Sequence, residues 1–385
     1  MSDARDAEAT GRRLLFVVTD DWYFVSHRLD LARAAIAAGY TVGVATRVAD
    51  HGSQITSAGC ELIPLDWRRR GTTLLHEIAT VAALRQAYRT FKPDFIHHVA
   101  MRPVLYGSIA ARSVPDALVV NAIAGRGYVF TSTDFRARLL RPFLRAAMRF
   151  ALGRRRTHVI LQNPEDRALI AGTRPDRTNA VTIIRGAGVD PSAFAASPIP
   201  PGAPIVMLAA RMLRSKGVPA FVDAARELRT AFPETRFVLV GDTDAGNYAA
   251  ISREELTEWN ASGVVEWWGH RADMPATLAQ SHIVCLPSTS GEGVPKVLIE
   301  AAAVGRAIVA TDVPGCREIV RNNVNGLLVG PGDARALASA IGLLLRDAPR
   351  VEKMGAASRS VAVNEFSIAR VAAATLDVYR ANTAR

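Results

Sequence analysis

The sequence predicts an α/β protein made of two doubly wound domains that face each other across a cleft. Short apolar segments alternate with longer segments of helical periodicity along most of its 385 residues. The short segments are apolar almost throughout, as in parallel strands that helices cover on both faces. The alternation is interrupted once, by the Pro-rich stretch 197–204. We therefore predict an N-terminal domain over 1–197 and a C-terminal domain over 198–385, with the last helix, about 366–385, as a candidate to pack back on the N-terminal domain.

The apolar segments define the expected strands in order. The first domain has seven of them, at 14–19, 41–46, 60–65, 95–100, 118–123, 158–162 and 181–186. The helix after the first strand ends at Gly39, a residue that commonly stops helices. The second domain has six, at 204–210, 236–241, 264–269, 283–288, 307–312 and 326–330. Ligands of such sheets bind beyond the carboxyl ends of the strands, so functional residues are expected in the loops that follow them.

The composition suits an anionic partner without selecting one. Lysine and arginine number 47 against 36 aspartates and glutamates, for a net charge of +11. Nucleotide diphosphates, nucleic acid and an anionic membrane surface all fit this excess. An arginine-rich composition imposed by a GC-rich genome explains it equally well.

The chain carries no targeting or membrane-spanning pattern. No stretch approaches the roughly 18–20 apolar residues that cross a bilayer. The polar N-terminal segment lacks the apolar region and cleavage site of a signal peptide, so we expect a cytoplasmic protein. Three cysteines without CxxC spacing predict neither a disulfide framework nor a zinc site.

The most informative segment is 287–305, PSTSGEGVPKVLIEAAAVG. A strand ends in a polar loop that carries Glu292, Pro295 stands where the first helical residue is expected, and Glu300 falls in the second turn. Eight helical residues span roughly 12 Å, which suits two carboxylates that accept hydroxyl groups at opposite ends of one ligand. The free amides at the helix start favour a diphosphate. Two solvated glutamates remain the alternative from spacing alone.

This segment resembles glycosyltransferase family 4, whose members have the two-domain GT-B fold. The resemblance rests on EGVPKVLIE, a Glu followed by seven residues and another Glu, and on the sequel AAAVGRAIVATDVPGCREIVRNNVNGLLV. It implies a C-terminal domain that binds a nucleotide-sugar donor and an N-terminal domain that binds the acceptor. It also implies that Glu300 binds the ribose hydroxyls and that Glu292 contacts the transferred sugar. Gly293, Val294 and Pro295 are implied as substrate-binding neighbours, with backbone amides of this segment facing the sugar and phosphate.

Two further loops of the C-terminal domain agree with the resemblance. Arg211 and Lys216 follow its first strand and match the paired basic residues that neutralise the donor diphosphate without a metal in this family. We therefore expect no metal and no cofactor. The Asp-x-Asp spacing at 242–244 is interpreted as part of a loop.

A turn after another strand is the expected base pocket. Gly269, His270 and Arg271 are implied by the resemblance to line this pocket with backbone contacts. Core packing is an equal explanation of the preceding tryptophans, 267–268.

The N-terminal domain is less explicit. The first strand is followed by no GxGxxG motif, which counts against a dinucleotide-binding dehydrogenase. His27, expected at the entry of the helix after this strand, is a candidate contact for acceptor or phosphate, with capping or packing as the alternative. Relatives often have a His near 118–130, where this chain has Asn121, Gly125 and Gly127. We take these three residues as acceptor-side candidates.

The stretch 134–156 predicts a basic amphipathic helix. Four arginines (138, 141, 145 and 149) form a stripe opposite apolar residues, and three more arginines follow at 154–156. Such a helix suits peripheral contact with an anionic membrane. A solvated helix whose apolar face packs on the sheet is the alternative.

These features predict a retaining, metal-independent glycosyltransferase. The order of motifs resembles bacterial enzymes that glycosylate undecaprenyl-diphosphate-linked sugars in surface polysaccharide assembly. The expected reaction transfers a hexose or N-acetylhexosamine from a UDP-linked sugar to a lipid-linked saccharide at the cytoplasmic face of the inner membrane. No nucleic acid partner is expected. A GT-B-fold UDP-N-acetylglucosamine 2-epimerase and a non-catalytic nucleotide-sugar binding protein are the alternatives.

Overall fold

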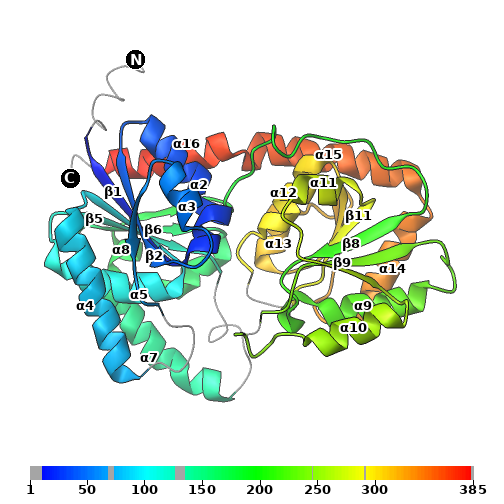
Figure 1. The fold of residues 1–385 in the computed structure, drawn as a ribbon, viewed down its shortest axis with the longest axis horizontal. Helices are drawn as coiled ribbons and strands as arrows, with labels where there is room; N and C mark the ends of the chain where they lie inside the picture. The colour runs from blue at the N-terminus through cyan, green and yellow to red at the C-terminus, as the bar shows by residue number, and fades with distance from the viewer. Residues whose placement is uncertain (1–10, 68–72, 126–134, 245, 290–291, 383–385) are drawn as a thin grey trace. The chain divides into compact units, whose positions relative to one another are not determined.

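A computed structural model describes residues 11–67, 73–125, 135–244, 246–289 and 292–382, without the side chains of 135–138 and 140. The chain divides into two compact units. The first comprises Met1–Ala187 and Ile368–Arg385, and the second comprises Gly188–Ser367. The division thus falls just before the Pro-rich stretch, and the chain returns to the first unit for its last helix (Figure 1).

The first unit is built on a seven-stranded parallel sheet in the order β3-β2-β1-β4-β5-β6-β7. Its strands are β1 (Arg13–Asp20), β2 (Thr41–Arg47), β3 (Glu61–Pro64), β4 (Phe95–Val99), β5 (Leu118–Ile123), β6 (Thr157–Leu161) and β7 (Val181–Ile183). Its helices are α2 (Asp21–Ala37), α3 (Gly52–Ser57), α4 (Leu74–Phe91), α5 (Met101–Ala110), α7 (Phe135–Ala151), α8 (Arg174–Arg177) and α16 (Ile368–Ala381), with 3-10 turns η1 (Ala111–Ser113) and η2 (Pro164–Leu169).

Helices cover both faces of this sheet because successive side chains of β1 point to opposite sides. Leu14 and Phe16 pack with α2, α3 and α16. Leu15 and Val17 pack with α4 and α5 on the other side (Figure 1). Every one of these four side chains is fully buried, which is why the strand reads as an unbroken apolar run.

The second unit repeats this design with a six-stranded parallel sheet in the order β10-β9-β8-β11-β12-β13. Its strands are β8 (Ile205–Ala209), β9 (Arg236–Val240), β10 (Glu266–Gly269), β11 (Ile283–Leu286), β12 (Ala307–Thr311) and β13 (Gly326–Val329). Its helices are α9 (Val218–Leu228), α10 (Arg253–Ala261), α11 (Met274–Ala279), α12 (Lys296–Val304), α13 (Pro314–Ile319), α14 (Ala334–Leu345) and α15 (Ala348–Phe366), with the 3-10 turn η3 (Arg214–Lys216).

The two parallel sheets confirm the predicted fold class, and each predicted strand segment overlaps one observed strand. Two helix starts differ from expectation. Pro295 is the residue before α12, with ψ of 121°, so the helix begins one residue later than predicted. Helix α2 begins at Asp21, directly after β1, which places His27 inside the helix rather than at its entry.

The β1–α2 junction is held by a buried carboxylate. Asp21 accepts hydrogen bonds from the amides of Trp22, Ala49 and His51 at 2.6 to 2.9 Å. Burial alone would raise the pKa of Asp21, but these amides outweigh it and the pKa is lowered. The side chain is therefore a structural anion that ties α2 to the loop after β2.

Candidate functional site

The structure brings Lys216 and Glu292 together, although they are 76 residues apart in sequence. Lys216 ends the turn after β8, and Glu292 lies in the loop after the neighbouring strand β11. The Lys216 Nζ to Glu292 Oε1 distance is 2.5 Å, and Ser288 Oγ donates to the same oxygen at 2.7 Å. Both side chains are mostly buried, with 21% and 11% exposed. A cation and a carboxylate thus share one point at the carboxyl edge of the sheet.

Close backbone contacts hold these two loops. Gly217 has a φ of +75°, and a Cβ there would lie 1.9 Å from the carbonyl oxygen of Pro287. A Cβ on Gly315, at the start of α13, would lie 1.5 Å from the carbonyl oxygen of Gly293. Both positions require glycine because another backbone occupies the space of a side chain. The glycines therefore set where Lys216 and Glu292 lie.

Glu300 is buried in the second turn of α12, with 5% of its surface exposed. Its carboxylate pairs with Lys296, one helical turn earlier. Burial raises the pKa of Glu300, while the ammonium of Lys296 acts in the opposite direction. A buried carboxylate with one cationic partner retains acceptor capacity for hydroxyl groups.

Arg211 is more exposed and pairs with Asp244 at 2.8 Å. The other aspartate of the Asp-x-Asp spacing, Asp242, pairs with Arg253 at 2.9 Å. Both carboxylates therefore have arginine partners. Across the described ranges, no group of three or more His, Cys, Asp or Glu residues is placed to hold a metal ion.

The turn after β10 forms a shallow pocket. Gly269 has a φ of +66°, and its carbonyl accepts from the amide of Gly241 at 2.8 Å. Arg271 lies over the Trp268 ring at 5.6 Å and lines a pocket of about 320 Å³, part of it open solvent, together with Thr277 and Gln280.

His270 in the same turn is exposed. Trp267 packs against the core of the unit, and its Nε1 donates to the carbonyl of Gly241 at 2.8 Å. Trp268 packs against the core of the unit and also lines the pocket. Core packing therefore describes both tryptophans, and a place in the pocket describes Trp268.

The acceptor-side candidates are less clearly grouped. His27 stacks on Tyr23 of the same helix at 4.1 Å. Asn121 is fully buried, and its Oδ1 accepts from His98 and from Ser108. These contacts occupy Oδ1 of Asn121, whereas its Nδ2 has no partner among the described residues. Contact of Asn121 with substrate stays a prediction.

The glycine candidates lie beyond β5. Gly125 has a φ of +83° in the turn after the strand, which explains glycine there without a ligand. Gly127 lies outside the described residues.

We call the residues around Glu292 and Glu300 in the second unit the donor-side cluster. Sequence reasoning missed three residues of this cluster. They are Ser288, Gly315 and Lys296, which contact Glu292, Gly293 and Glu300 respectively. The spacing of Lys296 and Glu300, four residues apart on one helix, could have indicated their pairing. Ser288 and Gly315 gave no such signal, because their contacts depend on loops meeting in space.

Comparisons with known proteins identify the family and the fold of the chain. Residues 13–163 match the family described as Glycosyl transferase 4-like, and residues 203–347 match Glycosyl transferases group 1. The Anabaena protein HepE, solved with UDP and glucose, superposes with a TM-score of 0.77 at 19% identity over 95% of this chain and 98% of its own. Two parallel sheets with helices on this plan define the GT-B architecture, and the two family matches make the chain a glycosyltransferase. The chain belongs to glycosyltransferase family 4.

Curated relatives include a named N-acetylgalactosaminyltransferase and a named sugar-phosphate synthase. The N,N'-diacetylbacillosaminyl-diphospho-undecaprenol alpha-1,3-N-acetylgalactosaminyltransferase of Campylobacter jejuni is 26% identical over 77% of this chain and 80% of its own length. The alpha-maltose-1-phosphate synthase of Mycobacterium tuberculosis is 32% identical over 47% of this chain, and the chain spans about half of that relative.

Proposed function

We propose that this glycosyltransferase moves a hexose or N-acetylhexosamine from a UDP-linked sugar to a lipid-linked saccharide, with retention of the anomeric configuration and without a metal. The carrying observation is the paired Lys216 and Glu292 at the carboxyl edge of a sheet whose next helix buries Glu300. The Campylobacter relative, whose name gives a diphospho-undecaprenol acceptor, supports the lipid-linked acceptor. The UDP in the HepE structure supports the nucleotide.

The chemistry requires positive charge at the leaving group. The bond from the anomeric carbon to the diphosphate breaks, and the acceptor oxygen bonds to that carbon on the same face. The acceptor proton passes to the departing diphosphate oxygen, so the step needs no separate base. Negative charge grows on the diphosphate, where Arg211 and Lys216 stabilise it. In the described structure both cations already face carboxylates, which hold them in place before the donor arrives.

Glu300 supplies the other end of donor recognition. As a buried carboxylate it accepts from the ribose hydroxyls, and Lys296 fixes its rotamer. Glu292, held by Lys216 and Ser288, contacts the transferred sugar.

Release of UDP by purified protein tests the proposal. Donors are UDP- and GDP-sugars, with and without a prenyl-diphosphate-linked saccharide, in EDTA. We expect release that depends on acceptor, persists in EDTA, and falls at least about 10²-fold in Arg211→Gln. Arg214→Gln is the matched control, since Arg214 lies in the same loop and is also exposed and ion-paired, to Glu255 at 2.7 Å. Interconversion of donor epimers without acceptor would identify an epimerase instead, and equal loss in both variants would remove Arg211 from the leaving-group site.

Peripheral membrane contact is the second part of the proposal. Among the described side chains of helix α7, Leu139, Phe143 and Phe150 are exposed, whereas Met148 and Ala151 are buried. The predicted apolar face is therefore divided, with Phe143 and Ala147 exposed and Met148 and Ala151 buried. Arg154 is an exception to the predicted basic cluster, because it donates to the carbonyls of three residues.

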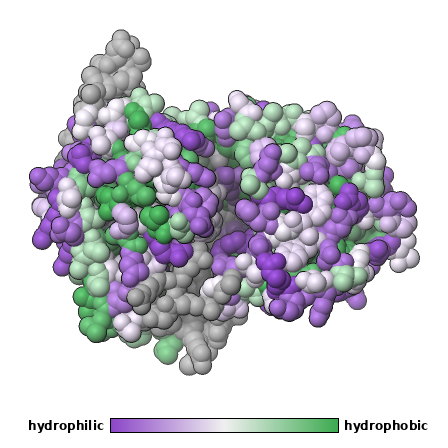
Figure 2. Space-filling model, viewed as in Figure 1, coloured by the Kyte–Doolittle hydropathy of each residue, from purple (hydrophilic) through white to green (hydrophobic). Residues whose placement is uncertain are grey.

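Helix α4 extends this exposed apolar surface to a second helix. Leu74, Leu75 and Ile78 are all more than half exposed at its start. Figure 2 shows hydrophobic atoms at the lower left of the view, over the end of α4 where the helix begins. No helix in the described ranges is long and apolar enough to cross a membrane. The apolar side chains and the arginines of α7 suit the interface of an anionic bilayer.

Vesicle sedimentation tests this contact. We expect binding to vesicles that contain phosphatidylglycerol and little binding to neutral ones, with a clear loss in the double variant Leu75→Ser/Phe143→Ser. The control is Leu343→Ser, which alters an exposed apolar side chain of the second unit. Equal binding by the double variant and wild type would contradict the assignment.

A further inference from the structure

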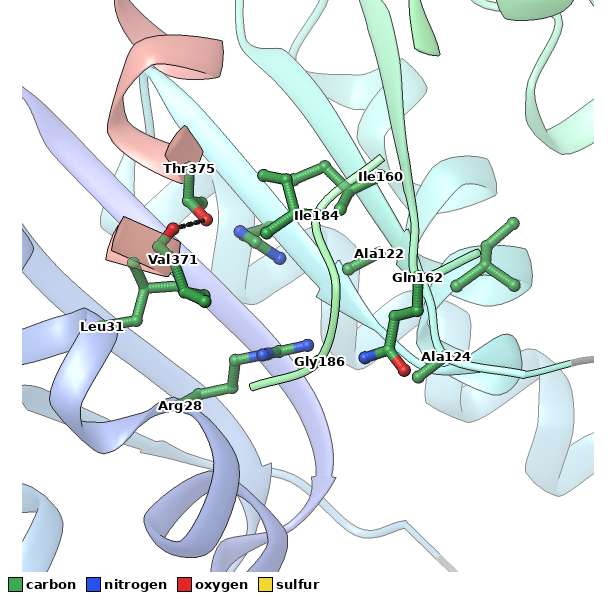
Figure 3. Close-up of a pocket in the computed structure, with 12 residues that line it drawn as sticks. Arg28, Leu31, Ala122, Ala124, Ile160, Gln162, Ile184, Gly186, Val371 and Thr375 are labelled. Atoms are coloured by element: carbon green, nitrogen blue, oxygen red, sulfur yellow. Dashed lines mark hydrogen bonds between the residues drawn. The ribbon is translucent and has the colours of Figure 1, made fainter. Parts of the chain in front are cut away.

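A second pocket lies wholly in the first unit, between the sheet and the helices α2 and α16 (Figure 3). About 310 Å³ there is free of protein atoms, a figure that includes open solvent, and the space that admits a water-sized molecule is about 10 Å³. Its polar side chains are Arg28, His97, Gln162 and Thr375. Thr375 is occupied within α16, where its hydroxyl donates to the carbonyl of Val371 at 2.7 Å. The donor-side residues described above lie in the other unit, so this pocket is not part of that cluster.

Arg28 places a buried guanidinium in this pocket. Only 6% of the residue is exposed, and its side chain extends from α2 toward Gly186 and Gln162 (Figure 3). Its Nη1 donates to the carbonyl of His27 at 3.3 Å, whereas its Nε has no partner within the described ranges. No carboxylate in that part of the chain pairs with it. Burying a charge without a counter-ion is costly, so the arrangement is explained by an anion that is itself a ligand.

His97 adds a hydrogen-bond donor to the same pocket. The ring is 1% exposed, and its Nδ1 lies 2.5 Å from the hydroxyl of Tyr379. Burial, aided by the charge of Arg28, lowers the pKa of His97 well below its usual value, so the ring is neutral. Burial also keeps Tyr379 protonated by raising its pKa. A hydroxyl that donates to Nδ1 leaves the ring proton on Nε2, which has no partner among the described residues.

We propose that this pocket is an oxyanion site, in which Arg28 binds a phosphate group and His97 donates a further hydrogen bond to it. Guanidinium groups match phosphate geometry, and a site shielded from water strengthens each contact. Tyr379 acts as a positioning residue through the His97 tautomer. The phosphate comes either from the diphosphate of a lipid-linked acceptor, which rests on the proposed function, or from free phosphate. Its described lining residues all belong to the first unit.

Thermal unfolding of the full chain with added inorganic phosphate tests the site. The titration is run with saturating UDP to fill the donor site, against sodium chloride at matched ionic strength. Wild type should show a saturable rise of Tm with phosphate, because a ligand bound only by the folded state stabilises it. Absence of a phosphate-specific rise in wild type overturns the proposal.

Two variants and one control give the test its specificity. Arg28→Met should remove the phosphate response while its ligand-free Tm equals or exceeds that of wild type, since a buried unpaired charge is gone. Tyr379→Phe should keep the fold and shift the phosphate midpoint at least about tenfold higher. Arg33→Met should respond like wild type, because Arg33 lies on the same helix but is exposed and paired with Asp30. A wild-type phosphate response in Arg28→Met, or an unchanged phosphate midpoint in Tyr379→Phe, overturns the proposal.

The source of the phosphate is decided by comparing pyrophosphate with farnesyl diphosphate in the same assay. A midpoint at least tenfold lower for farnesyl diphosphate assigns the site to the lipid-linked acceptor. Equal midpoints assign it to the free anion. UDP binding is measured separately on each variant. If wild type does not bind UDP, the proposed donor site is contradicted. The phosphate titration would still test whether Arg28 binds an anion.

Discussion

The substitution Gly315→Ala tests whether α13 holds the loop of Glu292 in its reactive position. An added Cβ would lie 1.5 Å from the carbonyl oxygen of Gly293 and 2.8 Å from that of Glu292. Ordinary van der Waals contact begins at 3.4 Å, so the Gly293 oxygen and the new Cβ must separate by about 1.9 Å. The φ of Gly315 is not in the left-handed region, so the effect is steric rather than one of backbone strain.

The magnitude follows from that displacement. A shift of about 1 Å in a positioned group costs about 10² in rate, so we expect at least that loss in acceptor-dependent UDP release. Overpacking should also destabilise the fold by about 1–3 kcal/mol, which urea unfolding measures. Gly330→Ala is the control, because its Cβ would meet only Asp333 Cβ, at 3.9 Å. A folded Gly315→Ala protein with the wild-type rate would refute the reasoning, since α13 would then have moved instead of the loop.

Three further predictions concern buried titratable side chains. Burial raises the pKa of Glu300 above 4.5, so the affinity for UDP should fall as the pH drops through that raised pKa. Isothermal titration calorimetry measures this affinity, which should not change with pH over the same range in Glu300→Gln. Burial lowers the pKa of His98 to about 4. The neutral ring therefore contributes on the order of 3 kcal/mol of stability above about pH 6.5, and this contribution is lost as the pH falls toward 4. The pH dependence of the unfolding free energy should weaken in His98→Gln, and an unchanged slope in that variant would contradict the prediction. Arg306 is fully buried and donates to several backbone carbonyls, so Arg306→Met should cost about 3 kcal/mol or more, whereas exposed Arg335→Met should cost close to zero.

Arg306 also shows a limit of sequence reasoning. The arginine gives no sign of its role in the sequence, where it stands between a helix and a strand. In the structure it donates to the carbonyls of Ser197 and Pro198 at 2.8 and 3.1 Å and to that of Ala279 at 2.9 Å. It thereby ties the Pro-rich stretch to the end of α11. Such a contact joins residues more than one hundred positions apart, which periodicity does not report.

Predictability was highest where a side chain's role depends on local pattern. Runs such as Leu14–Val18 predicted parallel strands, since a strand covered on both faces must be apolar at every position. The apolar face of α7 was predicted to pack or to meet a membrane, and the pattern could not choose. In the structure Phe143 is exposed and Met148 is buried, and contact with a membrane stays a prediction.

The sequence by itself determined the two parallel sheets, the order of their strands along the chain, and the loop and helix that carry Glu292 and Glu300. These follow from hydrophobic periodicity and turn residues, which act over a few neighbouring positions. Only the tertiary structure decided that Lys216 meets Glu292, that Asn121 is buried, and that the guanidinium of Arg28 has no carboxylate partner in the described part of the chain. These depend on which distant segments fill the space around a side chain, because burial and pairing are properties of packing rather than of spacing.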